Sequence, residues 1–197
     1  MRRFKRAGIF SLFLLGISAI AVGLFEPRAR LFWATRKFAH PPAYVALPVE
    51  GLAPGDVKSQ WHAPRSGGRR HKGIDLFAPK GTRVLSATNG VVWKVGNDAL
   101  GGRVVTVLGE GPALYYYAHL DDWAEGLKPG LEVRAGTALG TVGNTGNART
   151  TPPHLHFGVY RLNLMGARAV DPAPMLVSAA ARPPKSSARG CALKAGL

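Results

Sequence analysis

Short apolar runs separated by turn residues occupy most of the chain between residues 49 and 176. The runs are about four to eight residues long, and Gly, Pro and Asn positions interrupt them. No segment there keeps a 3.6-residue apolar period beyond about two turns, so long amphipathic helices are not expected. The pattern predicts an all-β domain with tight turns at Asn89-Gly90 and around residues 128–136. Strands are expected near residues 74–77, 82–87, 90–96, 103–108, 113–119, 138–143 and 154–161.

An apolar stretch near the N-terminus has a different pattern. Ile9–Phe25 contains no charged residue and follows four basic residues between positions 2 and 6, which predicts an apolar helix. This helix is either a signal-anchor that stays in the membrane or a signal peptide cleaved after Ala19-Ile20-Ala21. A buried helix of a soluble protein is disfavoured because the stretch has no polar face. In both favoured cases the rest of the chain is delivered across a membrane.

These patterns divide the chain into four parts. Residues 1–25 form the signal-anchor or signal peptide, and residues 26–48 form a basic, Pro-containing linker. Residues 49–176 form the folded domain. Residues 177–197 are rich in Ala, Pro, Arg and Ser and are expected to be disordered, because they cannot bury much apolar surface. Within the linker, residues 28–38 are interpreted either as a plain spacer or as a segment that lies on a lipid surface.

Composition and charge narrow the class of protein. The chain includes 25 Gly and 15 Pro, which disfavours a helical bundle, and 46% hydrophobic residues, which excludes a wholly disordered chain. The formal net charge is +15, but residues 1–39 hold eight of the 26 basic residues and only one acidic residue. The sequence shows no basic stripe with interleaved aromatics and no DNA-binding spacing, so we expect no nucleic-acid partner. The single cysteine, Cys191, excludes an intramolecular disulfide and a thiolate zinc cluster.

A His-x-His pair is the first candidate for chemistry. His154 and His156 are two residues apart in an expected strand, so their side chains point to the same face. Leu155 and Phe157 point to the opposite face, toward the expected core. One imidazole of the pair can bind a metal ion while the other stands beside the open position of that ion.

His71 and Asp75 are the second candidate. Four residues of straight strand span about 13 Å, which is too far for two ligands of one ion. The chain must therefore bend at Lys72-Gly73 if both residues bind the same metal. Together with His156 they provide two nitrogens and one carboxylate oxygen, which is the composition of a catalytic zinc site with one open position.

Two further histidines are left for acid–base work. His119 lies in the segment Tyr117-Ala118-His119-Leu120, and His154 is the other member of the His-x-His pair. An imidazole titrates in the required range and can also donate to an oxyanion. His40 and His62 are expected outside the site, in the linker and before the first strand. Each motif alone is weakly specific, but the three together in one β domain predict a metal site.

The three motifs occur in an order that resembles the lysostaphin-type (LytM-like) zinc endopeptidases of bacterial peptidoglycan. The order is His-x-x-x-Asp, Tyr-x-His-Leu and Pro-His-Leu-His-Phe, and the segments Gly73–Leu76, Ala78–Val84 and Gly143–Gly146 also fit. The similarity runs from about residue 64 to residue 160. The segment Trp61–Arg65 departs from the more usual Phe-Gly-x-Arg at one wall of the groove.

The resemblance implies a fold, a metal and a set of roles. The fold is an antiparallel β-sheet, β-sandwich-like domain with a substrate groove, related to the lipoyl/biotinyl hairpin architecture. The implied cofactor is Zn²⁺, bound by His71, Asp75 and His156. His119 and His154 are implied to be catalytic: one takes the proton of the water, and the other stabilises the oxyanion or protonates the leaving amine, in an order left open. The implied substrate is the peptide cross-links or stems of peptidoglycan.

In this interpretation the chain is a cell-envelope enzyme. Its domain works in the periplasm, anchored in the inner membrane through residues 9–25 if they are not cleaved, or secreted after cleavage. The alternative is a membrane-anchored, non-catalytic activator of another wall hydrolase, and a regulatory protein partner would be unknown. Relatives of that kind have lost metal ligands. Here all five ligand and catalytic positions are filled. A lipoyl- or biotinyl-type carrier is disfavoured because no Lys lies beside Met165 or Met175. The residues Tyr115–Tyr117 either line the groove or pack within their strand.

Overall fold

The structure is a computed structural model that describes residues 42–177. The helix predicted at residues 9–25, most of the linker and the tail after residue 177 lie outside the described residues. The same holds for His40 and Cys191. Within residues 42–177, the structure contains no helix with the length and apolar character needed to cross a bilayer.

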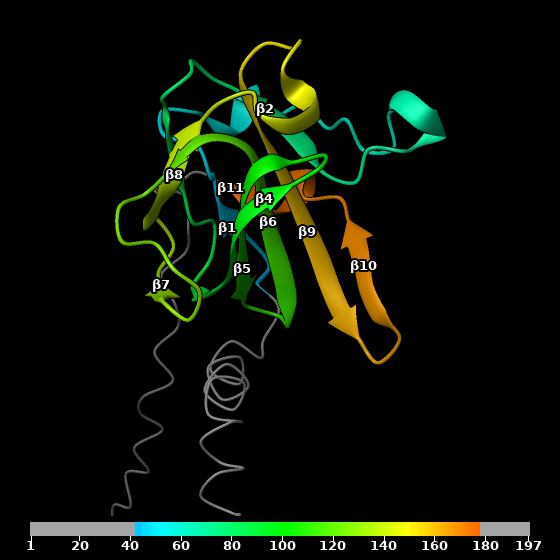
Figure 1. The fold of residues 1–197 in the computed structure, drawn as a ribbon. Coiled ribbons are helices and arrows are strands. Elements are labelled where there is room, and N and C mark those ends of the chain that lie inside the picture. The colour runs from blue at the N-terminus through cyan, green and yellow to red at the C-terminus, as the bar shows by residue number, and fades with distance from the viewer. Residues whose placement is uncertain (1–41, 178–197) are drawn as a thin grey trace, which may run out of the picture.

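Nine strands form one antiparallel sheet, as Figure 1 shows. They are β2 (Ile74–Phe77), β3 (Arg83–Leu85), β4 (Gly90–Asp98), β5 (Gly102–Gly109), β6 (Ala113–Trp123), β7 (Glu132–Val133), β8 (Ala138–Val142), β9 (His154–Asn163) and β10 (Gly166–Val170). Along the main path the order is β10-β9-β6-β5-β4-β7, with β2 paired to β9 and β8 paired to β6 and β3. The prediction of an antiparallel all-β domain is confirmed for this sheet. The helical elements described are short 3₁₀ turns: η1 (Pro54–Asp56), η2 (Ser66–Gly68), η3 (Gly146–Ala148) and η4 (Ala173–Met175).

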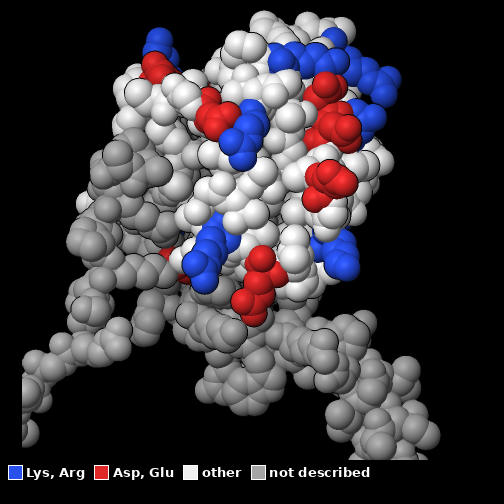
Figure 2. All heavy atoms as spheres, turned by 90° about the vertical axis from the view of Figure 1, so that its left-hand side faces the viewer, with Lys and Arg blue, Asp and Glu red and all other residues white. Residues whose placement is uncertain are grey.

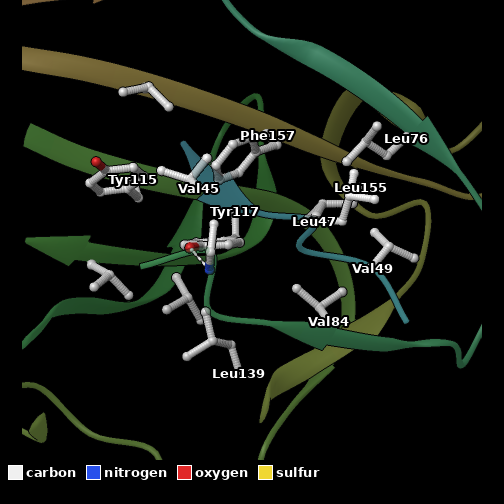
Figure 3. Close-up of a cluster of buried hydrophobic side chains, with 14 of the residues drawn as sticks. Val45, Leu47, Val49, Leu76, Val84, Tyr115, Tyr117, Leu139, Leu155 and Phe157 are labelled. Atoms are coloured by element: carbon white, nitrogen blue, oxygen red, sulfur yellow. Dashed lines mark hydrogen bonds between the residues drawn. The ribbon is translucent and has the colours of Figure 1, made fainter. Parts of the chain in front are cut away.

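Alternate residues of the central strands form the core. Tyr115 and Tyr117 of β6 and Phe157 of β9 are fully buried, and each such side chain contributes about 1.5–3 kcal/mol of burial free energy. Figure 3 shows them together, with the Tyr117 hydroxyl accepting a hydrogen bond of 2.9 Å from the backbone N–H of Ala87. The three consecutive tyrosines therefore lie in different environments. Tyr115 and Tyr117 pack in the core, and Tyr116 points to the other face of the strand.

A two-stranded parallel sheet joins the two ends of the described chain. In it β1 (Val45–Ala46) pairs with β11 (Leu176–Val177), and Val45 lies opposite Leu176. Val45 and Leu47 are buried in the same core as the large sheet, as Figure 3 shows. The sequence pattern assigned both residues to the linker and did not predict parallel pairing. Strands of two residues are too short for alternation to reveal, so the folded part begins before residue 49.

Several strands extend beyond their predicted ends. β9 continues to Asn163 and then forms a hairpin with β10, which the sequence pattern did not predict. All residues from Arg161 to Arg168 are exposed, so no apolar alternation marks this hairpin. β10 lies at the end of the strand order and pairs with β9 alone, so backbone hydrogen bonds to β9 hold it in the sheet.

The face of the molecule shown in Figure 2 has charges of both signs. Lysines and arginines are interspersed there with acidic residues rather than gathered in one patch. Among the described residues, Lys80 pairs with Asp121 at 3.1 Å and Arg83 pairs with Glu50 at 3.0 Å. Exposed pairs of this kind contribute little to stability, with a median of about 0–1 kcal/mol.

Candidate active site

The pairing of β2 with β9 places predicted site residues on one face of the sheet. Asp75 lies opposite His156 in the antiparallel register, and His154 lies two residues before His156 on the same strand. The neighbours Ile74 and Leu155 are fully buried in the core. The alternation predicted for the His-x-His pair therefore places both imidazoles on the face away from the core.

His71 reaches the same place because the chain bends before β2. The bend lies at Gly73, and β2 begins at the next residue, which confirms the predicted bend. A Cβ atom at Gly73 would lie 2.8 Å from imidazole atoms of His156 and 2.5 Å from the backbone oxygen of Phe157, so this close approach requires glycine. The Nδ1 atom of His71 lies 3.0 Å from the carbonyl oxygen of Gln60. Because a carbonyl can only accept, Nδ1 holds the proton and Nε2 is free to bind a metal.

Three candidate ligand atoms lie at nearly equal distances. His71 Nε2 is 3.0 Å from His156 Nδ1 and 3.1 Å from Asp75 Oδ1, and His156 Nδ1 is 3.0 Å from Asp75 Oδ1. Two ligands of a tetrahedral zinc ion with bonds of about 2.0–2.1 Å are about 3.3 Å apart, so all three edges match that geometry closely. Two imidazole nitrogens and one carboxylate oxygen are also ligand types found in catalytic zinc sites. These residues fit the metal that the sequence predicts.

Arg65 holds the second oxygen of Asp75. Its guanidinium donates to Asp75 Oδ2 at 2.5 Å, while Oδ1 faces the two histidines. Burial by itself would raise the pKa of the Asp75 carboxyl, but the neighbouring imidazoles of His156 and His71 outweigh burial and hold the pKa well below its usual range. Asp75 is therefore ionised, with one oxygen directed at the site. The sequence pattern does not predict this contact, because no periodicity links Arg65 to a residue ten positions away.

His119 faces the site because of a β-bulge in β6. Regular alternation after Tyr117 would direct His119 into the core. Between Tyr117 and Leu120, however, β6 contains one residue more than the facing part of β5, and His119 has a φ of 64°. The extra residue shifts the alternation. The His119 ring consequently lies 5.0 Å from the ring of His154 and 5.9 Å from that of His156, measured between centroids.

Thr145 fixes the orientation of the His119 ring. The Nδ1 atom of His119 donates to the Thr145 carbonyl oxygen at 2.9 Å, which leaves Nε2 as the free nitrogen. The Thr145 hydroxyl donates to the Leu120 carbonyl oxygen at 2.8 Å and accepts from the Arg103 backbone N–H at 2.9 Å. Burial and the neighbouring His154 lower the pKa of His119 to about 4, so its imidazole is neutral at neutral pH.

His154 presents the same nitrogen as His119. Its Nδ1 atom donates to the Pro152 carbonyl oxygen at 2.8 Å, and its Nε2 atom lies 3.9 Å from Asp75 Oδ1. The structure therefore brings all five predicted site residues together, with two free Nε2 atoms beside three candidate ligand atoms. Their roles as zinc ligands and acid–base groups remain predictions.

An open cavity of about 990 Å³ contains this site. Tyr116 lines it and donates a hydrogen bond of 2.7 Å to Asp98, and burial together with Asp98 raises the pKa of Tyr116. His62, by contrast, is exposed, does not line the cavity and stacks on Trp61 at 4.7 Å. One wall of the cavity is basic. It is lined by Arg65, Arg69, Arg70 and Lys72.

Comparison with known proteins identifies the family. Residues 69–172 match the model of peptidase family M23, and this stretch is more than half of the chain. The chain belongs to peptidase family M23. M23 is a metallopeptidase family, and the matched residues include the ligand triangle and both further histidines. The resemblance to lysostaphin-type enzymes is thereby confirmed.

Individual M23 relatives support the assignment. The L-Ala–D-Glu endopeptidase of Bacillus subtilis is 38% identical over 138 residues, which cover 66% of this chain and 42% of the relative. The glycyl-glycine endopeptidase ALE-1 of Staphylococcus capitis is 34% identical over 114 residues, which cover 57% of this chain and 30% of the relative. The catalytic domain of lysostaphin from Staphylococcus simulans superposes with a TM-score of 0.50 at 27% identity, covering 59% of this chain and 90% of that one. The chain spans less than half the length of the two curated relatives.

Proposed function

We propose that the chain is a zinc-dependent endopeptidase that hydrolyses peptide bonds in the cross-links or stems of peptidoglycan. The observation that supports this most directly is the triangle of His71 Nε2, Asp75 Oδ1 and His156 Nδ1 beside two free imidazole nitrogens. A zinc ion bound there would polarise the scissile carbonyl and lower the pKa of a bound water to about 7.

The chain's own residues supply orientation and proton transfer. Arg65 fixes Asp75, and the Gln60 carbonyl fixes His71, so the ligand atoms are held before any metal arrives. His119 and His154 each direct a free Nε2 atom toward the site. Either nitrogen can accept a proton from water and return it to the leaving amine. The two rings have the same tautomer, so the geometry leaves their order of action open.

The basic wall bears on the choice of substrate. Two relatives are named for different bonds: one follows L-Ala and precedes the acidic residue D-Glu, and the other joins two glycines. Arg69, Arg70 and Lys72 are exposed on the cavity wall and would attract a carboxylate. We therefore favour a stem peptide that contains an acidic residue over a neutral glycine bridge. A non-catalytic activator would need no such wall and no complete ligand set.

We also propose that the domain acts in the periplasm. The apolar, basic-flanked segment at residues 9–25 supports delivery to the periplasm, with anchoring in the inner membrane. A reporter fused after Leu197 should be active only if it works in the periplasm. Mass spectrometry of the mature N-terminus then separates a start at Met1, which means an anchor, from a start at Val22, which means cleavage.

The decisive assay uses the purified full chain and purified peptidoglycan. We expect about one zinc per chain and release of new amines that stops on chelation and returns with zinc. His156→Ala should lose both metal and hydrolysis. Mass spectrometry of the fragments identifies the bond, and a stem with its D-Glu carboxylate amidated should be cleaved more slowly. Metal-loaded protein that cleaves no peptidoglycan, but stimulates another wall hydrolase, would support the activator instead.

A further inference from the structure

The hairpin of β9 and β10 ends in an exposed apolar tip. Leu164 and Met165 are 107% and 98% exposed, more than any other large hydrophobic residue described, and Leu162 is 39% exposed. Single exposed apolar residues are ordinary. Two adjacent apolar residues that are both fully exposed at a turn are unusual, because neither side chain buries apolar surface in the folded chain. The tip therefore has the character of a contact surface.

A pair of like charges lies directly behind the tip. Arg161 of β9 and Arg168 of β10 are cross-strand partners in the antiparallel register, and both are exposed. Directly opposed side chains point to the same face, and like charges in this position destabilise a sheet. The sequence contains no acidic residue between positions 160 and 170. The pair would therefore be stabilised by an external anion.

The hairpin lies far from the active site. Figure 1 shows β9 running from the site end of the sheet to the hairpin, which projects at the opposite end. Between His156 and Asn163, seven steps of about 3.3 Å separate the two regions by about 23 Å. Tyr160 also lines the cavity, and three further steps, about 10 Å, separate it from Asn163, so a partner bound at the tip would leave the ligand residues accessible.

We propose that this tip docks onto an anionic lipid surface. Its two apolar side chains would enter the boundary between headgroups and acyl chains, and its two arginines would bind lipid phosphates. The small size of the apolar patch favours lipid over protein, because a stable protein interface needs about 20–30 residues on each side. Contact of this kind is weak and reversible, so it orients a domain that is already held near a membrane.

The length of chain before the domain is compatible with such contact. If the apolar stretch that ends at Phe25 stays in the membrane, residues 26–41 separate it from the described domain. Fully extended, they span at most about 55 Å. The tip can therefore reach the same bilayer. Docking would hold the candidate ligand residues away from the lipid, because His156 lies near the other end of β9.

The test places a fluorescent reporter at the tip of the full chain. With Cys191→Ser as background, Leu164→Cys is labelled with an environment-sensitive dye and the protein is reconstituted into vesicles. We compare pure phosphatidylcholine with a mixture that contains about one third phosphatidylglycerol. The tip dye should shift to the blue and be quenched by acyl-chain spin labels in the anionic vesicles. The same dye at Ser66→Cys, on the site end, should stay in water.

Two kinds of substitution separate the contribution of charge to docking from that of apolar contact. Each arginine near an anionic leaflet should contribute about fivefold to the docked fraction, so Arg161→Gln and Arg168→Gln should each reduce it by about that factor. Met165→Ser should reduce it without changing its salt dependence. Hydrolysis of soluble peptidoglycan fragments should be unchanged in all three. The docking result stands even if the chain cleaves nothing, so it fails separately from the proposed function.

Two outcomes would overturn the proposal. One is a tip dye that stays as exposed to water in anionic vesicles as the dye at Ser66→Cys. The other is a blue shift that rises with protein concentration and ignores phosphatidylglycerol, which would make the hairpin a contact between copies of this chain. The labelled proteins must show the same thermal transition as the parent chain, so that a misfolded hairpin is recognised as such.

Discussion

β9 contributes a directly opposed cross-strand pair near each of its ends, and the two pairs differ in kind. Near its start, His156 faces Asp75 in a mostly buried setting, with Nδ1 and Oδ1 3.0 Å apart. Near its end, Arg161 faces Arg168, and both side chains are exposed. The first pair attracts and the second repels. Both belong to the same antiparallel sheet, so the difference comes from the side chains and their burial.

The difference shows which partner each end can accept. The buried end gathers lone pairs of nitrogen and oxygen, which suit a cation. The exposed end gathers two positive charges, which suit an anion. Interactions are strong where water is excluded and are screened where it is not. Substitutions at the buried end should therefore have much larger effects than substitutions at the exposed end.

The largest effect should come from Asp75→Asn. The change keeps the shape of the side chain but removes the negative charge from the ligand triangle. Zinc content should fall from about one per chain to near zero, and hydrolysis should fall by at least about 10³-fold. Plasma emission spectroscopy measures the zinc content, and release of amines measures hydrolysis. Asp122→Asn, at an exposed position near the end of β6, is the matched control. A metal-replete Asp75→Asn protein would remove Asp75 from the ligand set.

The next effect should come from His119→Asn. Asparagine tolerates the positive φ at this position better than alanine does. Turnover should fall about 10²–10⁴-fold while zinc is retained. The double variant that also carries His154→Gln should turn over only slightly more slowly than the less active of the two single variants, because both residues act in the same step. His62→Asn is the control, since His62 also has a positive φ but lies outside the cavity. Loss of zinc in the His119→Asn protein would identify His119 as a metal ligand.

Acid should destabilise the zinc-free chain through the buried end. The pKa of His119 is about 4 in the folded state and about 6.5 unfolded, so between these values the unfolded chain binds more protons. The free energy of unfolding should therefore fall by up to about 3 kcal/mol as the pH drops from about 6.5 to about 4. Urea titrations across this range measure it. His119→Asn should show a shallower fall, and an equal slope in both proteins would contradict the assignment.

Arg65→Gln should weaken zinc binding without abolishing it. The arginine touches Asp75 rather than the metal position, and loss of such a supporting contact costs about 10–100-fold in metal affinity. Competition with a chromogenic chelator gives the affinity, and Arg65→Lys should restore part of it. The control Arg69→Gln removes the same charge from the same loop, but the Arg69 side chain donates to Ser66 rather than to Asp75. Equal effects of the two substitutions would mean that charge alone matters.

The smallest effect should come from Arg168→Glu at the exposed end. An attractive cross-strand pair with Arg161 replaces a repulsive one, which is worth about 0.2–1 kcal/mol. The Tm should rise by about 1–3 °C, while docking to anionic vesicles becomes weaker. Lys94→Glu is the control, because its cross-strand partner is the neutral Thr106. A lower Tm in Arg168→Glu would show that the two arginines do not repel each other in the folded chain.

Much of the buried end could be predicted from the sequence. Alternation alone places His154 and His156 on one face, and the distance argument requires the bend that Gly73 provides. His119 is different. The alternation of Tyr115 and Tyr117 would bury it, and only the bulge against β5 turns it toward the site. One extra residue in a strand has no sequence signature of its own, so the residue type and its motif pointed to His119 where periodicity did not.

The contacts that cross between loops could not be predicted either. Arg65 reaches Asp75, and Thr145 reaches His119 from a turn 26 residues away. Such contacts depend on the path of irregular backbone, which no apolar period describes. The β9–β10 hairpin was missed for the opposite reason. Its outer residues are all exposed, so nothing in the pattern of burial separates them from a loop.

The short parallel pairing of β1 with β11 has a consequence for how this domain combines with others. Neighbouring strands lie about 4.8 Å apart, so the chain enters the domain at Val45 and leaves it after Leu176 within a very small distance. A domain whose two ends are adjacent can be moved as a unit into another chain. It can be inserted into a loop of a host protein, or circularly permuted with a linker of a few residues, without separating β2 from β9. The same property suits a domain whose relatives embed the matching segment in chains more than twice its length.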